Sequence, residues 1–201
     1  MTDEGELLAK AGENLAKIIA QLSFDFWSGR DFRKLISFDS ISQTEQDRIF
    51  NELEVSVLGL FVLNLDHVIS TSKSSEQEII FSKLRQAIIE GFLNINKQVG
   101  VPQQFVNQWR LLIDMRLEEY RKDFKLALKE SKKVKELEDD QLKGIWAKVE
   151  TITIDCLTHI RRGDVKKEDP LWRMLRKHFT YLEATFDKLT LQISNQPAGV
   201  S

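Results

Sequence analysis

Two polar side chains interrupt the apolar face of a long helix expected in the first half of the chain, and they are the first candidates for chemistry. Asn64 falls in the middle of that face and His67 lies at its edge. An unpaired polar group inside a protein costs about 1 to 3 kcal/mol. The sequence therefore predicts partners on a neighbouring helix, with Arg116, Glu119 or His159 as the candidates. The pair then either fixes the helix register or belongs to a binding site.

A second polar interruption lies further along the chain, where Arg116 projects into the middle of an aromatic and apolar face. Glu119 and Asp123 follow on the same side of the helix. If these side chains are exposed, they form intrahelical ion pairs worth a few tenths of a kcal/mol, and the Arg116 head reaches water past Tyr120. If they are buried, they form a costly charged cluster, of the kind that proteins keep for specificity or for a site.

A carboxylate and an imidazole stand four residues apart in the second half of the chain, at Asp155 and His159. At this spacing on a helix they can share a metal ion, or the carboxylate can orient the ring. His178 occupies a similar position on the last expected helix. No Glu is followed three residues later by His, the spacing found in di-iron helical bundles, and the sequence predicts no metal site.

Sequence motifs of common catalytic chemistry are missing. The chain has no Gly-rich phosphate loop, no Gly-X-Ser-X-Gly elbow, no His-Glu-X-X-His and no cysteine pair for zinc. The single cysteine, Cys156, has an apolar setting that favours an inert core thiol over a nucleophile. The polar interruptions remain as the candidate ligand-binding residues, with no cofactor assigned to them: Asn64, His67, Arg116, Glu119, Asp155 and His159.

Helices must position these residues, because apolar residues recur at spacings of three and four and no long segment alternates as a strand would. We expect an all-α, single-domain bundle of about six helices, at least four of them long and mainly up-down, with a short aromatic helix closing one end. The expected long segments are residues 4–21, 42–69, 76–98, 102–135, 141–162 and 170–193. The domain covers residues 1–195, and a flexible tail covers residues 196–201.

Residues typical of helix ends stand at the boundaries of these segments: Ser42 with Glu45, Ser75 with Glu78, Gly100, Pro102, Gly163, Asp169 and Pro170. In a capping box, a serine hydroxyl accepts from a backbone N–H and a glutamate three residues later reaches back. A glycine just past a helix takes the left-handed conformation at little cost, and a proline fits the first helical position. After the first helix we expect an aromatic connection with Phe24, Phe26 and Trp27.

Composition and charge place the chain among soluble globular proteins. Of its 201 residues, 42% are apolar and 30% are charged, and 29 basic against 31 acidic side chains give a net charge of −2. This balance argues against a nucleic-acid partner. The acidic N-terminus is unlike a secretory signal and a single cysteine fits a reducing compartment, so we expect a cytoplasmic protein. The most apolar stretch, residues 55–65, is shorter than the about 20 residues of a membrane span, which predicts a core helix and no membrane.

Basic side chains concentrate in the last part of the chain, where residues 121–201 hold 17 basic and 13 acidic side chains. The densest runs are Arg121, Lys122, Lys125, Lys129, Lys132, Lys133 and Lys135, and then Arg161, Arg162, Lys166 and Lys167. They are typical of solvated helix ends, and alternatively of a surface for an anionic partner such as an acidic protein face or a nucleic-acid backbone.

Two functions of different classes follow from these features. Because no catalytic constellation is present, the first is a non-catalytic module or adaptor that binds another macromolecule, either a protein partner or a second copy of the chain. The alternative is a small-molecule or metal-binding enzyme whose polar site lies inside the bundle. That site would use the six candidate ligand-binding residues, and it requires them to be buried and to converge.

Overall fold

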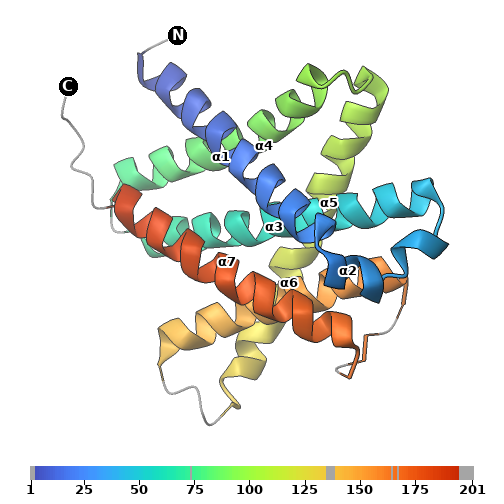
Figure 1. The fold of residues 1–201 in the computed structure, drawn as a ribbon. Coiled ribbons are helices and arrows are strands. Elements are labelled where there is room, and N and C mark those ends of the chain that lie inside the picture. Colours follow the sequence, from blue (N-terminus) through green and yellow to red (C-terminus); the bar gives the residue numbers. More distant parts are fainter. Residues whose placement is uncertain (1–2, 73, 135–138, 164, 167, 195–201) are drawn as a thin grey trace.

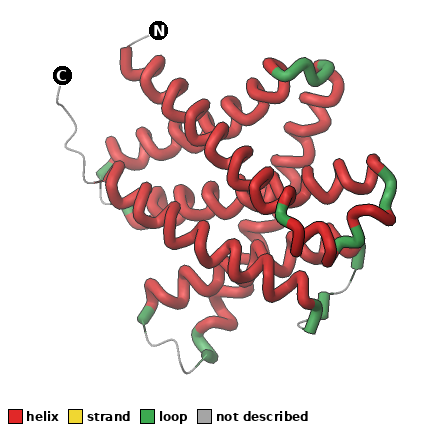
Figure 2. The backbone as a smooth tube through the Cα atoms, in the orientation of Figure 1, coloured by secondary structure: helices red, strands yellow, loops and turns green. Residues whose placement is uncertain are grey.

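The computed structural model describes residues 3–72, 74–134, 139–163, 165–166 and 168–194. Helices make up 88% of the chain and the described residues contain no strand, which confirms the all-α prediction. The elements, shown in Figure 1, are α1 Asp3–Ser28, α2 Arg30–Leu35, the 3₁₀ helix η1 Phe38–Ser40, α3 Gln43–Thr71, α4 Ser75–Gln98, α5 Gln103–Ser131, α6 Asp140–Arg161 and α7 Pro170–Ser194. Among the described residues, six α-helices are long and α2 is short, and Figure 2 shows that brief loops join most of them.

Helix α3 runs through the middle of the molecule, and all the other long helices contact it (Figure 1). Every residue from 52 to 65 is buried, because apolar side chains surround the helix instead of forming one stripe. By length and composition, α3 is also the one helix in the described part of the chain that could cross a membrane. Its most apolar window has a mean hydropathy of 1.5 and is 72% buried inside the protein. The apolar segment is thus longer than the stretch noted in the sequence, and it forms the centre of the core.

Helices α1 and α4 lie against each other at close range. A Cβ atom on Gly12 would lie 2.5 Å from the backbone carbonyl carbon of Ala87, and a Cβ atom on Gly91 would lie 2.9 Å from the Cα of Glu13. No side chain fits in that space, so the two glycines fix the point at which the helices meet. The rest of α1 then reaches α3 and covers one side of it.

The first helix is longer than expected. It continues past residue 21 to Ser28 and takes in the aromatic segment that the sequence assigned to a connection. The Trp27 ring lies 5.3 Å from the rings of Phe38 and Phe50, and the Phe26 ring lies 4.9 Å from that of Phe32. These tertiary contacts favour continued helix, because they bury the aromatic face against α2, η1 and α3.

Helix ends confirm some of the expected caps and shift others. The Ser42 hydroxyl accepts from the Glu45 N–H, and Asp169 caps α7, which begins at Pro170. Gly100 has the expected positive φ, of 87°. The cap of α4 is Ser74 rather than Ser75, and Pro102 is itself a cap rather than the first helical residue.

The end of α6 differs from the prediction in a more informative way. Arg162, not Gly163, holds the left-handed position, with φ 56°, and the Gly163 N–H bonds to the Thr158 carbonyl. A non-glycine residue in this conformation needs support from its surroundings. Arg162 finds it in an ion pair of 2.6 Å with Glu45 of α3. The described part of α5 ends at Ser131, and Lys135 and the expected tail lie outside the described residues.

The contact between Gly59 of α3 and Tyr120 of α5 generates a stability prediction. A Cβ atom on Gly59 would lie 2.4 Å from the Tyr120 ring, which is fully buried and hydrogen-bonded to Ser56 at 3.1 Å. Gly59→Ala should therefore lower the free energy of unfolding by about 1 to 3 kcal/mol, because the ring cannot move aside. The measurement is urea denaturation followed by circular dichroism.

Gly144 of α6 is the matched control, since a Cβ atom there would meet nothing within 4 Å. Gly144→Ala should raise the free energy of unfolding by up to about 1 kcal/mol, because alanine has the higher helix propensity. Equal effects of the two substitutions would show that the Tyr120 contact does not control the packing of α3 on α5.

Candidate functional site

The structure divides the six candidate residues between a partly buried group, a buried group and one exposed position. Four of them lie between α3, α5 and α6, where a glutamate of α3 joins them in what we call the charged cluster: Glu52, Arg116, Glu119, Asp155 and His159. Asn64 belongs instead to what we call the buried triad, with Lys148 and Glu183. His67 is exposed.

The charged cluster is built on a two-pronged contact between Arg116 and Glu52. The Arg116 Nε and Nη2 atoms donate to the two Glu52 carboxylate oxygens at 2.9 and 2.8 Å. The side chains are only 12% and 9% exposed, so Arg116 does not extend to water past Tyr120 as one reading of the sequence expected. Burial opposes the charge of Arg116, but the hydrogen bonds and charge of Glu52 outweigh it and raise the pKa of the guanidinium.

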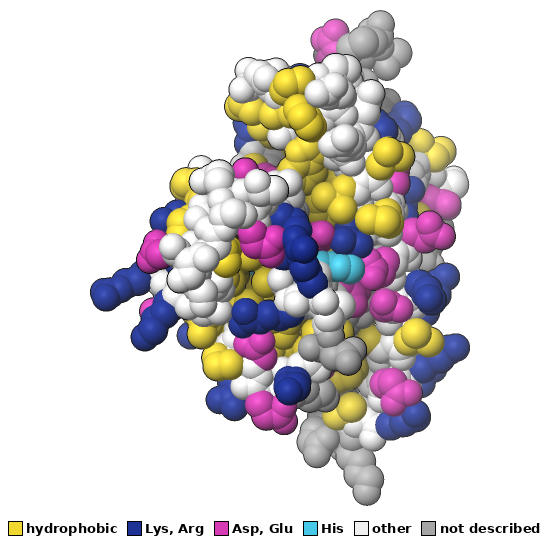
Figure 3. All heavy atoms as spheres, turned by 90° about the vertical axis from the view of Figure 1, so that its right-hand side faces the viewer, with side chains coloured by type: hydrophobic (Ala, Val, Ile, Leu, Met, Phe, Trp, Pro, Cys, Tyr) yellow, Lys and Arg dark blue, Asp and Glu magenta, His cyan; other side chains and the backbone are white. Residues whose placement is uncertain are grey.

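Glu119 joins the helices at the edge of this cluster. One of its oxygens accepts from Arg116 at 3.2 Å and lies 3.0 Å from the Nε2 atom of His159. The carboxylate that orients His159 is therefore Glu119 of the neighbouring helix, and not Asp155 four residues earlier. In Figure 3, basic and acidic side chains mix around a histidine on the face shown, with hydrophobic side chains gathered above them.

Asp155 is the member of the charged cluster with unused hydrogen-bonding capacity. It is 8% exposed, and within the described residues its Oδ2 atom has no partner. Burial, with the charges of Asp123 and Glu119, raises the pKa of Asp155 to about 8, so it carries a proton at neutral pH. A second carboxyl of this kind, Glu54 of α3, has its pKa raised to about 8 by burial.

Arg48 connects the start of α3 to the end of α6. It donates to the backbone carbonyls of His159 at 2.6 Å and Ile160 at 2.9 Å, which lack helical partners at the end of α6. Its other contacts are with the Glu45 carboxylate. That carboxylate pairs with Arg48 and Arg162 instead of completing the capping box. These contacts are structural, because they satisfy backbone groups.

The buried triad lies deeper, between α3, α6 and α7. The Lys148 ammonium donates to the Asn64 carbonyl at 2.6 Å and forms an ion pair with Glu183, while the Asn64 amide donates to Glu183 at 2.5 Å. The Lys148 and Glu183 side chains are 4% and 1% exposed. Asn64 thus has partners, as predicted, but they are not Arg116, Glu119 or His159.

The sequence contains a feature that indicates the buried pair of Lys148 and Glu183. Glu183 stands within an apolar stripe, between Phe179 and Phe186, and Lys148 precedes Ile152 by one helical turn. A positive and a negative residue on two apolar faces suggest a buried pair. The spacing within each helix does not say that the faces meet, so the pair could not be assigned without the fold.

His67, which the sequence places at the edge of the apolar face of α3, is exposed. It lies at the rim of a pocket that is also lined by residues of α6 and α7. His178 stacks on Phe26 with the ring centroids 4.0 Å apart, and burial lowers its pKa to about 4. The described residues hold no group of three or more His, Cys, Asp or Glu placed to bind a metal ion.

The single thiol is buried, as its apolar setting predicted. Burial raises the pKa of Cys156 to about 12, which keeps the thiolate unavailable at neutral pH. Burial also raises the pKa of Tyr120 well above its usual value. Neither side chain is therefore placed for nucleophilic or acid–base work.

A basic groove lies between α4 and α5. It encloses about 920 Å³, and its lining includes Arg85, Arg121, Lys122, Lys125 and Lys129. Four of these belong to the basic run noted in the sequence. Of that run, Lys132 and Lys133 lie outside the groove lining.

A carboxylate of α3 organises this basic groove. Asp66 pairs with Arg85 of α4 and, at 2.7 Å, with Arg121 of α5. A guanidinium has five N–H donors, so both arginines keep donors that Asp66 does not use. In the second basic run, Arg161 pairs with Asp169 and Arg162 pairs with Glu45.

Comparison with protein-family models, with curated proteins and with solved structures finds no match to this chain. No residue role can therefore be carried over from a relative. What the chain can do has to follow from its own geometry, which offers the charged cluster, the buried triad and a basic groove with donors to spare.

The Arg116–Glu52 contact generates a second stability prediction. Arg116→Leu should lower the free energy of unfolding by about 3 to 5 kcal/mol, because it leaves the Glu52 carboxylate buried without a counter-charge. The double variant Arg116→Leu, Glu52→Leu should recover most of that loss, because no unpaired charge remains. Urea denaturation of the two single variants and the double variant measures the coupling.

Arg110 and Glu90 provide the matched control, since they pair at 2.7 Å but are 44% and 41% exposed. Arg110→Leu should change the free energy of unfolding by less than about 1 kcal/mol. A similar cost at both sites would show that burial adds nothing to the Arg116 pair.

Asp155 generates a prediction about pH. Its pKa is near 8 in the folded protein, against an ordinary value of 3.8, so the folded state holds a proton that the unfolded chain releases. The contribution of this proton to the free energy of unfolding is fully present below about pH 4, decreases as pH rises, and is lost once pH has passed 8. Asp155→Asn removes the dependence. As pH rises from 5 to 8, the free energy of unfolding of the variant should increase relative to that of wild type by up to about 1.4 kcal/mol per pH unit.

Asp140→Asn is the control for that titration. The Lys143 hydrogen bond lowers the pKa of Asp140, so its proton equilibrium lies below this pH window. Its stability relative to wild type should stay constant from pH 5 to 8. A flat difference for Asp155→Asn as well would show that Asp155 is ionised in the folded protein.

Proposed function

We propose that the protein is a non-catalytic binding module, and that the basic groove between α4 and α5 holds an acidic amphipathic helix of a protein partner. The observation that carries this proposal is the convergence of five basic side chains from two helices over an apolar floor. Helix-in-groove docking is a common mode of protein recognition.

The charge of the basic groove favours an acidic occupant. Its lining has five basic side chains and two acidic ones, Asp114 and Glu118. Asp66 offsets part of the charge of Arg85 and Arg121 and fixes their heads close to each other. The remaining N–H donors suit carboxylates, because charge-assisted hydrogen bonds are about twice as strong as neutral ones.

The apolar residues of the basic groove favour a helix over a simple anion. Ile89 and Leu117 are 8% and 4% exposed, and Leu126 at the edge is 52% exposed. An amphipathic helix would place apolar residues on this floor and acidic residues on the flanking lysines. Two neighbouring α5 residues, Leu111 and Met115, are 70% and 53% exposed and extend the apolar surface along that helix.

A protein partner fits the groove better than a nucleic acid does. The lining includes two carboxylates and no aromatic side chain on which bases could stack. We therefore take an acidic protein segment as the occupant.

The alternative, an enzyme with a polar site inside the bundle, has less support. It requires the six candidate residues to converge, whereas Asn64 and His67 lie apart from the charged cluster. Arg116 and Glu119 also spend their hydrogen bonds on Glu52 and His159. Groups that satisfy one another have little capacity left for a substrate.

Charge reversal in the basic groove tests the proposed function. The probe is a synthetic amphipathic helix with glutamates on one face and leucines on the other, and the measurement is fluorescence anisotropy. The wild-type chain should bind this peptide, more weakly as salt increases. Lys122→Glu with Lys125→Glu should weaken binding at least about tenfold, because every 1.4 kcal/mol of lost attraction is a factor of ten.

The control variant carries the same charge change outside the groove, at Lys34 and Lys188, which are exposed. It should bind the peptide as wild type does. A single-stranded DNA that binds as well as the peptide would refute the choice of partner. Equal peptide binding by both charge-reversal variants would refute the groove as the site.

A further inference from the structure

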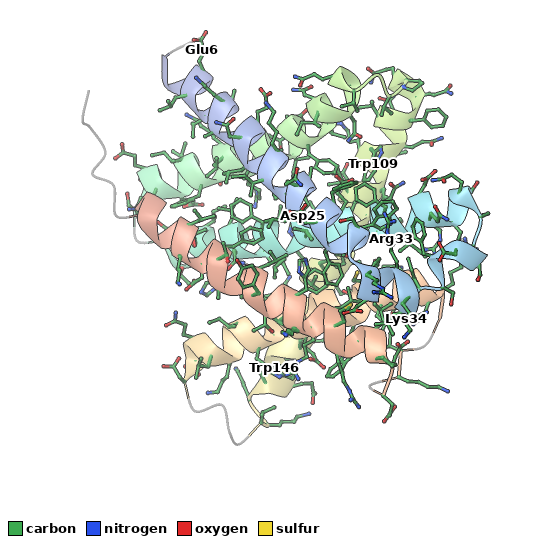
Figure 4. All side chains as sticks on the ribbon, in the orientation of Figure 1. Glu6, Asp25, Arg33, Lys34, Trp109 and Trp146 are labelled. Atoms are coloured by element: carbon green, nitrogen blue, oxygen red, sulfur yellow. The ribbon has the colours of Figure 1, made fainter. Side chains whose placement is uncertain are left out.

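A second pocket, which shares no residue with the basic groove, lies where α3, α6 and α7 diverge. It encloses about 430 Å³ above the buried triad, and Lys148 and His67 are among its lining residues. In Figure 4, the labelled Trp146 marks the part of α6 that borders it, between the lining residues Ile145 and Lys148. The pocket thus joins a buried charged floor to an open rim.

Lys148 has a hydrogen-bond donor that the buried triad does not use. An ammonium group has three N–H donors. One goes to the Asn64 carbonyl and one to the Glu183 carboxylate, and within the described residues the third has no acceptor. Lys148 is 3% exposed and lines the pocket, so a molecule inside the pocket can supply an acceptor for that donor.

Gly144 keeps the pocket open at a cost to α6. Glycine in the interior of a helix is less stable than alanine there. No packing reason explains it at this position, since a Cβ atom would meet nothing within 4 Å. The space that the missing side chain leaves belongs to the pocket. A local loss of helix stability that opens a cavity is typical of a binding site.

The other walls offer two carboxylates and one apolar surface, and the Asp140 carboxylate is paired with Lys143. Asp187 of α7 lines the pocket, and within the described residues no basic side chain forms an ion pair with it. Val68, Phe124 and Ile145 line the pocket with apolar side chains. A donor, a carboxylate and an apolar wall therefore bound one cavity, and each is free to contact a small molecule.

We propose that this pocket binds a small zwitterion, an α-amino acid with an apolar side chain. The carboxylate of the amino acid accepts from the unused Lys148 donor, and its ammonium group donates to Asp187. Its side chain packs against Val68, Phe124 and Ile145. The pocket has the size and the mixture of apolar walls and few polar groups that are usual for small-molecule sites.

The experiment is isothermal titration calorimetry on the dialysed full chain with L-leucine as the probe. L-leucine should bind saturably. Two truncated probes separate the polar contacts: 4-methylpentanoate, which lacks the ammonium group, and 3-methylbutylamine, which lacks the carboxylate. Each should bind at least about tenfold more weakly, a loss of 1.4 kcal/mol. Asp187→Asn should weaken L-leucine without changing the affinity for 4-methylpentanoate.

Gly144→Leu puts a large side chain into the pocket from a position where the Cβ atom itself meets nothing within 4 Å, and it should abolish L-leucine binding while the chain remains folded by circular dichroism. Gly163→Leu is the matched control, because a Cβ atom there also meets nothing within 4 Å and Gly163 lies outside the pocket. It should bind L-leucine as wild type does.

Three results would overturn the proposal. The first is no heat from L-leucine or from any other standard amino acid. The second is equal L-leucine binding by wild type and Gly144→Leu. The third is binding of a neutral polyol such as glycerol in the absence of amino-acid binding. None of these results bears on the acidic peptide and the basic groove, so the two proposals fail independently.

Discussion

Burial of α3 on every side is the constraint on which the rest of the structure depends. Once residues 52 to 65 leave water, a polar side chain on α3 either finds a partner on a surrounding helix or, like Glu54, keeps a proton instead of a charge. Glu52 takes Arg116 of α5, and Asn64 takes Lys148 of α6 and Glu183 of α7. The polar residues of one helix thereby select the residues of three others that must face it, and fix their register along the core axis.

The cost of these buried charges suggests that they serve specificity rather than stability. An apolar pair of similar volume is often as stable as a buried ion pair, whereas a buried charge without its partner is expensive. A slip of α5 or α6 along α3 would separate Arg116 from Glu52 or Lys148 from Asn64. The arrangement thus penalises wrong packings of a nearly uniform apolar helix, which the apolar contacts alone would tolerate.

The spacing of apolar residues was enough to predict the helices, the central place of α3 and several caps, because these depend on neighbours within a few residues. It was not enough to predict which helices meet. Asn64 was correctly expected to need partners, but Lys148 is 84 residues away and belongs to another helix. The exposure of His67 and the left-handed conformation of Arg162 could not be predicted for the same reason. The first depends on which part of α3 the other helices leave uncovered, and the second on the Glu45 carboxylate that α3 supplies.

The difference between satisfied and unsatisfied polar groups then separates scaffold from site. Arg116 and Glu52 use their hydrogen-bonding capacity on each other, so they hold helices together and offer little to a ligand. Lys148 belongs to both, because two of its donors hold the buried triad together and the residue also lines a pocket. Asp66 likewise holds Arg85 and Arg121 in place, and these two arginines line the basic groove with N–H donors that Asp66 does not use. The pocket and the basic groove both lie toward the end of α3, where the surrounding helices diverge. Because the helices diverge there, polar side chains keep hydrogen-bonding groups that another molecule can use.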